Sequence, residues 1–252
     1  MVSAFTATPL RCTPEQRRAG IGLIAFSGRA AAPVARIEPS SSTTVIVVPR
    51  CSEVGVSAAG RDEARFADAF LVAAGAGPIS TEYGGRLDCV EIALPPWGPR
   101  ALLGERPSAT DGPVRLDDLI GDGPPGDSSD AVAAWVERQL HAVRWLPSRE
   151  VRYAAGRLRE SGGRLRIASL AEEIGWSERY LSARFADANG VTPKRFARLV
   201  RFEAARRDVL VSDAPLAGIA IGRGYADQAH MTREFVEFSG ATPSATRRNG
   251  LA

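Results

Sequence analysis

The stretch RFADANGVTP at residues 184–193 is followed fifty residues later by EFVEFSGATP at residues 234–243. Both stretches carry a Phe, a Gly five positions later, and then Thr-Pro. A glycine can adopt the left-handed conformation that ends a helix, and Thr and Pro are favoured at the cap and in the first turn of the next one. Each stretch is therefore predicted to end one helix and start another, through Gly190, Thr192 and Pro193 and through Gly240, Thr242 and Pro243.

Upstream of each stretch the sequence predicts the same pair of helices. In SLAEEIGWSERYLSARF, Ser169 and Glu172 have the spacing of a capping box, Gly175 turns the chain, and Ser177 caps a second helix. PLAGIAIGRGYADQAHMTREF follows the same plan, with Asp227 in the capping role. A short helix, a glycine-bearing turn and a second helix form the helix-turn-helix motif, whose second helix enters the DNA major groove.

A long helix is predicted between the two units, over residues 194–211. Its inward positions are apolar, and arginines lie on its other faces. At ~1.5 Å per residue it forms a rod of about 27 Å. Successive major-groove segments on one side of a duplex lie roughly 34 Å apart, so such a rod can present both second helices to one DNA face. The inward residues are Phe196, Leu199, Phe202, Ala205 and Val209, and the outward arginines are Arg195, Arg198, Arg206 and Arg207.

Charge divides unevenly along the 252-residue chain. Residues 1–151 carry 15 Arg against 18 acidic residues, and residues 152–252 carry 17 Arg and Lys against 11 acidic residues. A basic module after a slightly acidic one indicates a polyanionic partner, although a solvated basic face is common in helical domains. No apolar run reaches the ~18–20 residues needed to span a bilayer, and no signal peptide is recognisable at the N-terminus.

Residues 1–125 have the texture of a β-rich domain. Short apolar runs at 21–26, 43–49, 69–75 and 89–95 are bounded by Gly, Pro and Ser, as is typical of strands. GDGPPGDSSD at 121–130 predicts a linker, and the helix that follows carries an apolar stripe of Val132, Trp135, Val136, Leu140 and Val143. The sequence thus predicts an α+β multidomain chain: a β-rich domain at 1–125, a linker and connecting helix at 126–150, and a helical DNA-binding domain at 151–252.

The helical part resembles the DNA-binding domain of AraC/XylS-type bacterial transcription regulators. The resemblance rests on LAEEIGWSERYLSARF, GVTPKRFARLVRFEAA, IAIGRGYADQAHMTREF and GATPSATR, and residues 1–125 resemble N-terminal domains of that family more loosely. It implies a sequence-specific regulator that reads two successive major-groove segments. Pro215 and Gly218 depart from the polar cap and acidic residue usual in the family, and Gly inside a helix costs about 1 kcal/mol relative to Ala. These departures predict a less rigid second unit.

The outer face of each second helix is predicted to touch DNA. Leu181 and Phe185 point inward, which leaves Arg179, Ser182 and Ala183 outside by i, i+3 and i+4 geometry. Matching them to the family's motif makes them base-edge candidates. Arg179 suits guanine, Ser182 a base or a phosphate, and Ala183 a thymine methyl.

The corresponding outer set on the later helix is Gln228, Ala229, Thr232 and Arg233. Gln228 suits adenine, and Arg233 suits a phosphate. Trp176 and Tyr225 occupy matching turn positions, where we expect both to face the core.

Two alternative functions are also compatible with the sequence. One is an enzyme housed in residues 1–125, with Cys51 or Cys89 as nucleophile, although neither lies in a nucleophile motif and both histidines fall in the helical part. The other is a non-specific architectural DNA binder. The three cysteines fit neither a disulfide framework nor a zinc site, which favours a cytoplasmic protein without a metal or cofactor.

Partners are implied by the resemblance more than by composition. Double-stranded DNA is the first. In the family, N-terminal domains sense small molecules or mediate dimerisation, so a small-molecule effector and a homodimer are candidate partners, with RNA polymerase added for an activator. No membrane association is expected.

Overall fold

The protein folds into two compact units. A computed structural model describes residues 4–50, 53–58, 64–104, 112–121, 123–126, 128–142 and 145–250. The first unit comprises Met1–Glu38 and Thr43–Leu146, and the second comprises Pro39–Ser42 and Pro147–Ala252. The first is rich in strands and the second is helical, which confirms the predicted α+β fold class.

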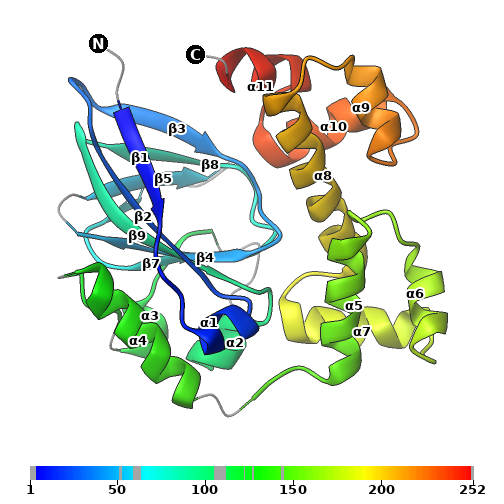
Figure 1. The fold of residues 1–252 in the computed structure, drawn as a ribbon, viewed down its shortest axis with the longest axis horizontal. Coiled ribbons are helices and arrows are strands. Elements are labelled where there is room, and N and C mark those ends of the chain that lie inside the picture. The colour runs from blue at the N-terminus through cyan, green and yellow to red at the C-terminus, as the bar shows by residue number, and fades with distance from the viewer. Residues whose placement is uncertain are drawn as a thin grey trace. The chain divides into compact units, whose positions relative to one another are not determined.

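The first unit contains two antiparallel sheets (Figure 1). The larger has the strand order β1-β2-β9-β4-β7-β10, and the smaller has the order β3-β8-β5-β6. The four predicted apolar runs correspond to β2, β4, β7 and β9. The strands are β1 (Ala4–Pro9), β2 (Gly22–Arg29), β3 (Val34–Glu38), β4 (Thr44–Pro49), β5 (Val54–Ala58), β6 (Ala64–Phe66), β7 (Phe70–Val72), β8 (Ile79–Tyr83), β9 (Arg86–Leu94) and β10 (Val114–Arg115).

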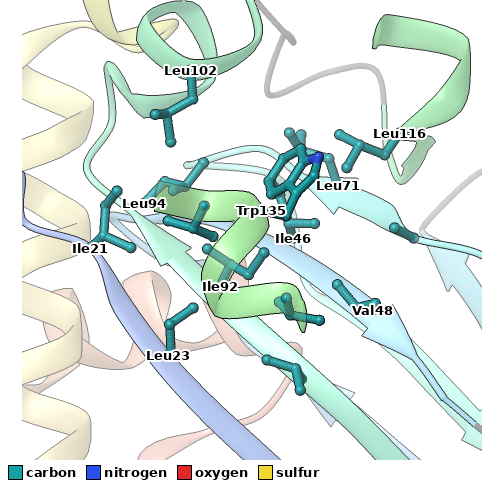
Figure 2. Packing of buried hydrophobic residues seen from close by; sticks show 14 of the residues in the cluster. Ile21, Leu23, Ile46, Val48, Leu71, Ile92, Leu94, Leu102, Leu116 and Trp135 are labelled. Atoms are coloured by element: carbon teal, nitrogen blue, oxygen red, sulfur yellow. The ribbon is translucent and has the colours of Figure 1, made fainter. Parts of the chain in front are cut away.

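The main core of this unit lies on one face of the larger sheet. Ile46 on β4, Leu71 on β7 and Ile92 on β9 are fully buried, because alternate residues of a strand point to the same side. Figure 2 shows Trp135 beside Ile46 and Leu71, with Leu116 close by. A second cluster contains residues of both sheets: Val54, Val56, Phe66, Phe70 and Ile79.

The helices in the described part of the first unit are α1 (Pro14–Arg18), α2 (Gly98–Leu103), α3 (Asp117–Ile120) and α4 (Ser129–Ala142). The helix expected as a connector at 126–150 is α4, and it packs on the β core instead. Val132, Trp135 and Val136 are buried in that core, so the first unit extends to residue 146. Leu140 is partly buried beside them, and Val143 lies outside the described residues.

The second unit is built around one long helix (Figure 1). Helices α5, α6 and α7 lie toward one end of α8, and α9, α10 and α11 lie toward its other end. The bounds are α5 (Arg149–Glu160), α6 (Ile167–Glu173), α7 (Glu178–Asn189), α8 (Pro193–Val211), α9 (Leu216–Gly222), α10 (Gln228–Ser239) and α11 (Pro243–Gly250). Phe196, Leu199, Phe202, Ala205 and Val209 on α8 are buried, as predicted. None of the described helices is long and apolar enough to cross a membrane.

A short segment from between β3 and β4 belongs to this helical unit. In Pro39–Ser42, the Ser42 N–H and the Ser41 and Ser42 hydroxyls all donate to the Glu203 carboxylate of α8, over 2.6–3.0 Å. The Ser40 N–H donates to the Phe238 carbonyl oxygen near the end of α10, at 2.7 Å. The charge on Glu203 is thereby stabilised by three hydrogen bonds from residues more than 160 positions away in sequence.

Two local expectations differ from the structure. Ser169 was expected to cap the first short helix, but α6 begins at Ile167 after Arg166, which makes no side-chain cap. Ser169 therefore lies inside the helix and cannot form the predicted capping box with Glu172. Trp176 was expected in the core, yet it is only half-buried and packs edge-to-face on the exposed ring of Tyr180, with centroids 4.8 Å apart.

Candidate nucleic-acid interface

The two helical repeats use the same local devices. In the first repeat Gly175 has φ +72° in the turn, and the Ser177 hydroxyl accepts from the Tyr180 N–H to cap α7. Gly190 ends α7 at φ +70°, and the Thr192 hydroxyl caps α8 by accepting from the Arg195 N–H at 3.2 Å. These observations confirm the predicted stop and start, because one orphan N–H group at the start of α7 and one at the start of α8 each find the expected side-chain acceptor.

The second repeat follows the same plan with different residues. The Asp227 carboxylate caps α10 by accepting from the His230 N–H at 2.6 Å. Gly240 ends α10 at φ +68°, and the Thr242 hydroxyl accepts from the Ala245 N–H at 3.2 Å. α9 has no side-chain cap, because Pro215 occupies its cap position. The Arg223 guanidinium, just after the last residue of α9, forms a two-bond ion pair with Asp208 of α8, both bonds at 2.6 Å.

Each second helix buries one face and exposes the other. On α7, Leu181 and Phe185 are fully buried. Arg179 and Ala183 are exposed on that helix, and Ser182 is half-buried. The structure therefore brings the three residues predicted on this helix to its outer side, as the i, i+3, i+4 spacing requires.

On α10, Met231 and Phe235 are fully buried, as their counterparts on α7 are. Gln228, Ala229 and Arg233 are exposed. Thr232 is half-buried, and its hydroxyl donates to the Gln228 carbonyl oxygen at 2.9 Å. The Thr232 hydroxyl proton is thus already used within the helix, which leaves its oxygen and methyl group to face outward.

Several arginines are held inside the helical unit by acids. Arg198 and Arg201 on α8 both donate to the Glu234 carboxylate of α10, at 2.7 and 2.9 Å. Arg201 is thus paired with an acid of its own unit. A guanidinium that is hydrogen-bonded to a buried carboxylate is not available to bind a DNA phosphate.

α7 has a second exposed edge that was not predicted. Tyr180, 50% exposed, and Arg184, also exposed, lie four residues apart and thus on one side of the helix. The signal was present in the sequence: once Leu181 and Phe185 are placed inward, the neighbouring positions 180 and 184 fall at the margin of the outer face.

The structure gives the cysteine chemistry little support. Cys89 is buried in β9, and burial, with Glu91 and Asp88 adding to it, raises the pKa of its thiol to about 12. The thiolate is the nucleophilic form, so burial and the raised pKa make Cys89 a poor nucleophile at neutral pH. Cys51 lies outside the described residues.

One group of described residues has the spacing of metal ligands. Glu15, Glu137 and His141 place their ligand atoms all within 4.8 Å of one another, where α1 meets α4. The His141 Nδ1 lies 2.8 Å from the Glu137 carbonyl oxygen, and its Nε2 lies 3.6 Å from Glu15 Oε2. Glu15 and His141 are solvent-exposed, and exposed acidic groups with this spacing are common without a metal.

Comparison with known families decides the nature of the helical unit. The sequence model of a family described as "Helix-turn-helix domain" matches residues 170–249. These residues form an AraC-type helix-turn-helix domain. The match runs from Leu170 of α6 into α11, so the AraC-type domain contains both repeats and the long helix between them.

Relatives of the AraC-type domain occur in other bacterial proteins. An uncharacterized HTH-type transcriptional regulator of Staphylococcus aureus (strain MRSA252) is 35% identical over 83 residues, which are 33% of this chain and 11% of that protein. The HTH-type transcriptional regulator Rv1931c of Mycobacterium tuberculosis is 32% identical over 95 residues, 38% of this chain and 37% of that protein. The matched region therefore spans only a small part of these relatives.

A solved structure shares the fold of nearly the whole chain. ToxT from Vibrio cholerae aligns with 90% of this chain and 98% of its own, with a TM-score of 0.53 and 10% sequence identity. At that identity the likeness concerns architecture alone: a β-rich unit followed by a helical one.

Proposed function

We propose that this chain is a sequence-specific DNA-binding transcription regulator whose helices α7 and α10 enter two successive major-groove segments of one duplex. The observation that carries the proposal is the repetition itself. Two helix-turn-helix units lie toward opposite ends of α8, and each leaves one face of its second helix exposed. A single unit of this kind would suit many helical proteins, whereas a matched pair suits a periodic ligand.

Duplex DNA offers that periodicity. The 19 residues of α8 make a rod of about 28 Å, and major-groove segments on one face recur roughly every 34 Å. The flanking helices add their own width to the rod. The spacing of the two second helices is therefore compatible with one turn of DNA.

The exposed residues of α7 are assigned to base reading. Arg179 is assigned to a guanine, whose O6 and N7 match the fork of a guanidinium. Ser182 is assigned to a base or a phosphate, and Ala183 to a thymine methyl group. On α10, Gln228 is assigned to adenine, Arg233 to a phosphate, and Ala229 and Thr232 to apolar contact through their methyl groups.

The experiment is selection of bound sites from a random DNA pool by the wild-type chain, Arg179→Ala and Arg233→Ala. Arg179→Ala is expected to lose preference at one base position, worth about 1–3 kcal/mol. Arg233→Ala is expected to weaken binding to all sequences alike and to reduce the salt slope by about 1. Arg152→Ala, at an exposed arginine of α5, serves as the matched control and should leave both quantities unchanged.

Equal losses on selected and random DNA for both variants would refute the division of roles. A wild-type chain that binds tightly yet enriches no sequence would instead support a non-specific architectural binder. Other partners stay predictions: a small-molecule effector in the β-rich unit, a second copy of the chain, and RNA polymerase.

A further inference from the structure

A buried carboxylate holds the second recognition helix to the long helix. The Glu234 side chain on α10 is only 2% exposed. Its Oε1 accepts from Arg198 Nε at 2.7 Å and from Arg201 Nη2 at 2.9 Å. These two arginines lie three residues apart on α8, so they stand on one side of that helix and face the same carboxylate.

Other groups fix the two guanidinium planes. The Arg198 guanidinium lies 4.9 Å from the Phe238 ring centre, and that of Arg201 lies 4.7 Å from the Tyr225 ring centre. Cation–π contacts and charge-assisted hydrogen bonds are directional, so each arginine has one preferred orientation. The buried cluster is thus specified more tightly than apolar packing alone would require.

The first repeat has no buried carboxylate at the matching position. Met231 corresponds to Leu181 at an offset of fifty residues, and by the same offset Glu234 corresponds to Arg184, which is exposed. Helix α7 is fixed to α8 by apolar contact, including Phe185 against Phe196 with ring centres 5.5 Å apart. Because just one of the two repeats has a buried acid at this position, the acid indicates a requirement specific to α10.

Stability alone does not account for this carboxylate. Buried ion pairs can often be replaced by apolar residues of similar size with little loss of stability or even a gain, because taking charges out of water is costly. Glu234 Oε2 and Arg201 Nε, moreover, are buried without a well-formed hydrogen bond to any described residue. Such a costly arrangement is better explained by the geometry that it fixes.

We propose that Glu234 is a positioning residue for DNA recognition, which sets the rotation and axial position of α10 on α8 through Arg198 and Arg201. Glu234 directly follows Arg233 in the sequence, and one residue along a helix is a rotation of about 100°. Any slip of α10 relative to α8 therefore redirects Gln228 and Arg233 away from the groove. The inference rests on the proposed reading of DNA by α10.

The test compares Glu234→Gln and Glu234→Met in the full chain with Glu237→Gln as control. The Gln variant keeps the shape and removes the charge, and the Met variant supplies an apolar side chain of similar volume that does not need partners. Glu237 contacts the same Arg198 from the surface, with its side chain 43% exposed, so its loss reports on surface ion pairing alone.

The readout is the base preference at each position of the site selected from a random pool. These positions are divided into two blocks. The α7 block is the one that weakens in Arg179→Ala, and the α10 block is the one that weakens in a Gln228→Ala variant. We expect the Glu234 variants to lose discrimination by at least about fivefold in the α10 block, the low end for one lost base contact. The α7 block and the Glu237→Gln control should keep wild-type preferences.

The outcomes separate this inference from the proposed function. Folded Glu234→Met protein that keeps both blocks overturns the positioning role, and so does an equal loss in both blocks. If Glu234→Met does not fold, because it leaves Arg198 and Arg201 without their buried acceptor, the Gln variant decides by the same criteria. A wild-type chain that selects no two-block site overturns the proposed function and the inference with it.

Discussion

The junction between α5 and α8 yields a prediction with a built-in control. After α5 the chain turns through Gly162 and Gly163, both left-handed, with φ +60° and +72°. A Cβ on Gly163 would lie 2.0 Å from the Ala197 carbonyl oxygen of α8, far inside contact distance. A Cβ on Gly162 would meet no other group within 4 Å. At both positions the left-handed backbone would strain an alanine, but only Gly163 lies against α8.

The expected costs follow from that difference. An alanine in the left-handed region costs about 1–2 kcal/mol, partly offset by the lower entropy of its unfolded chain, so Gly162→Ala should cost about 1 kcal/mol. Gly163→Ala adds an overlap with backbone that cannot rotate away. Overpacking of this kind typically costs a further 1–3 kcal/mol, which brings the total to about 2–4 kcal/mol.

The assay is thermal unfolding of the full chain followed by circular dichroism at 222 nm, where helices dominate. For a domain of about 100 residues, such as the helical unit, a loss of 1 kcal/mol in the free energy of unfolding lowers Tm by about 4 °C or more. Gly163→Ala should therefore melt roughly 4–12 °C below Gly162→Ala. Equal Tm values for the two variants would show that α5 does not approach α8 as closely as described, and would refute the reasoning.

Three further predictions concern charge and hydrogen bonding. Burial, with the nearby Glu38 adding to it, raises the pKa of Glu91 from its usual 4.5 to about 7. Its protonation therefore stabilises the folded β-rich unit fully below pH 4.5, and this stabilisation is lost as the pH rises through 7. Urea unfolding should accordingly show a lower free energy of unfolding at pH 8 than at pH 5, and Glu91→Gln should reduce that difference. Native Cys89 should react with iodoacetamide at pH 8 far more slowly than half-buried Cys12, and similar rates measured by peptide mass spectrometry would contradict its burial. Ser42→Ala removes one hydrogen bond to the Glu203 carboxylate and should lower the free energy of unfolding of the helical unit by about 1.5–3 kcal/mol, whereas an unchanged circular-dichroism melt would speak against that bond.

The helical unit was predictable because its signals are local. Each turn is indicated by residues close together in the sequence: Gly190 with Thr192, and Gly240 with Thr242. The repetition removes most of the ambiguity of a single motif. The start of α6 was misplaced for the opposite reason. Ser169 offers a cap in the sequence, yet the helix begins two residues earlier without any side-chain cap, since tertiary packing can override such a weak preference.

The β-rich unit was only partly predictable. Strands with buried apolar runs, such as β4, stand out in the sequence. β3 and β8 do not, because β3 exposes Ile37 and β8 carries Ser, Thr and Glu between its buried ends. Strand pairing in these regions depends on partners far along the chain.

At the candidate interface, the outward residues followed from helical periodicity, but the partners of the buried charge did not. Glu234 lies three residues after Met231 and four before Phe238, which places it on the apolar face of α10. Its partners Arg198 and Arg201 are 36 and 33 residues away, and no local pattern indicates them. The placement of Pro39–Ser42 in the helical unit was equally invisible, since it joins residues more than 160 positions apart. Which faces point outward was thus a local property, whereas what holds those faces in place was not.

Hydroxyl-radical footprinting of the wild-type chain on its selected duplex tests the central claim most directly. If α7 and α10 enter successive major-groove segments, two protected stretches will appear on one face of the DNA, about 10–10.5 base pairs apart. A single protected stretch, or two stretches half a turn apart on opposite faces, would contradict the account.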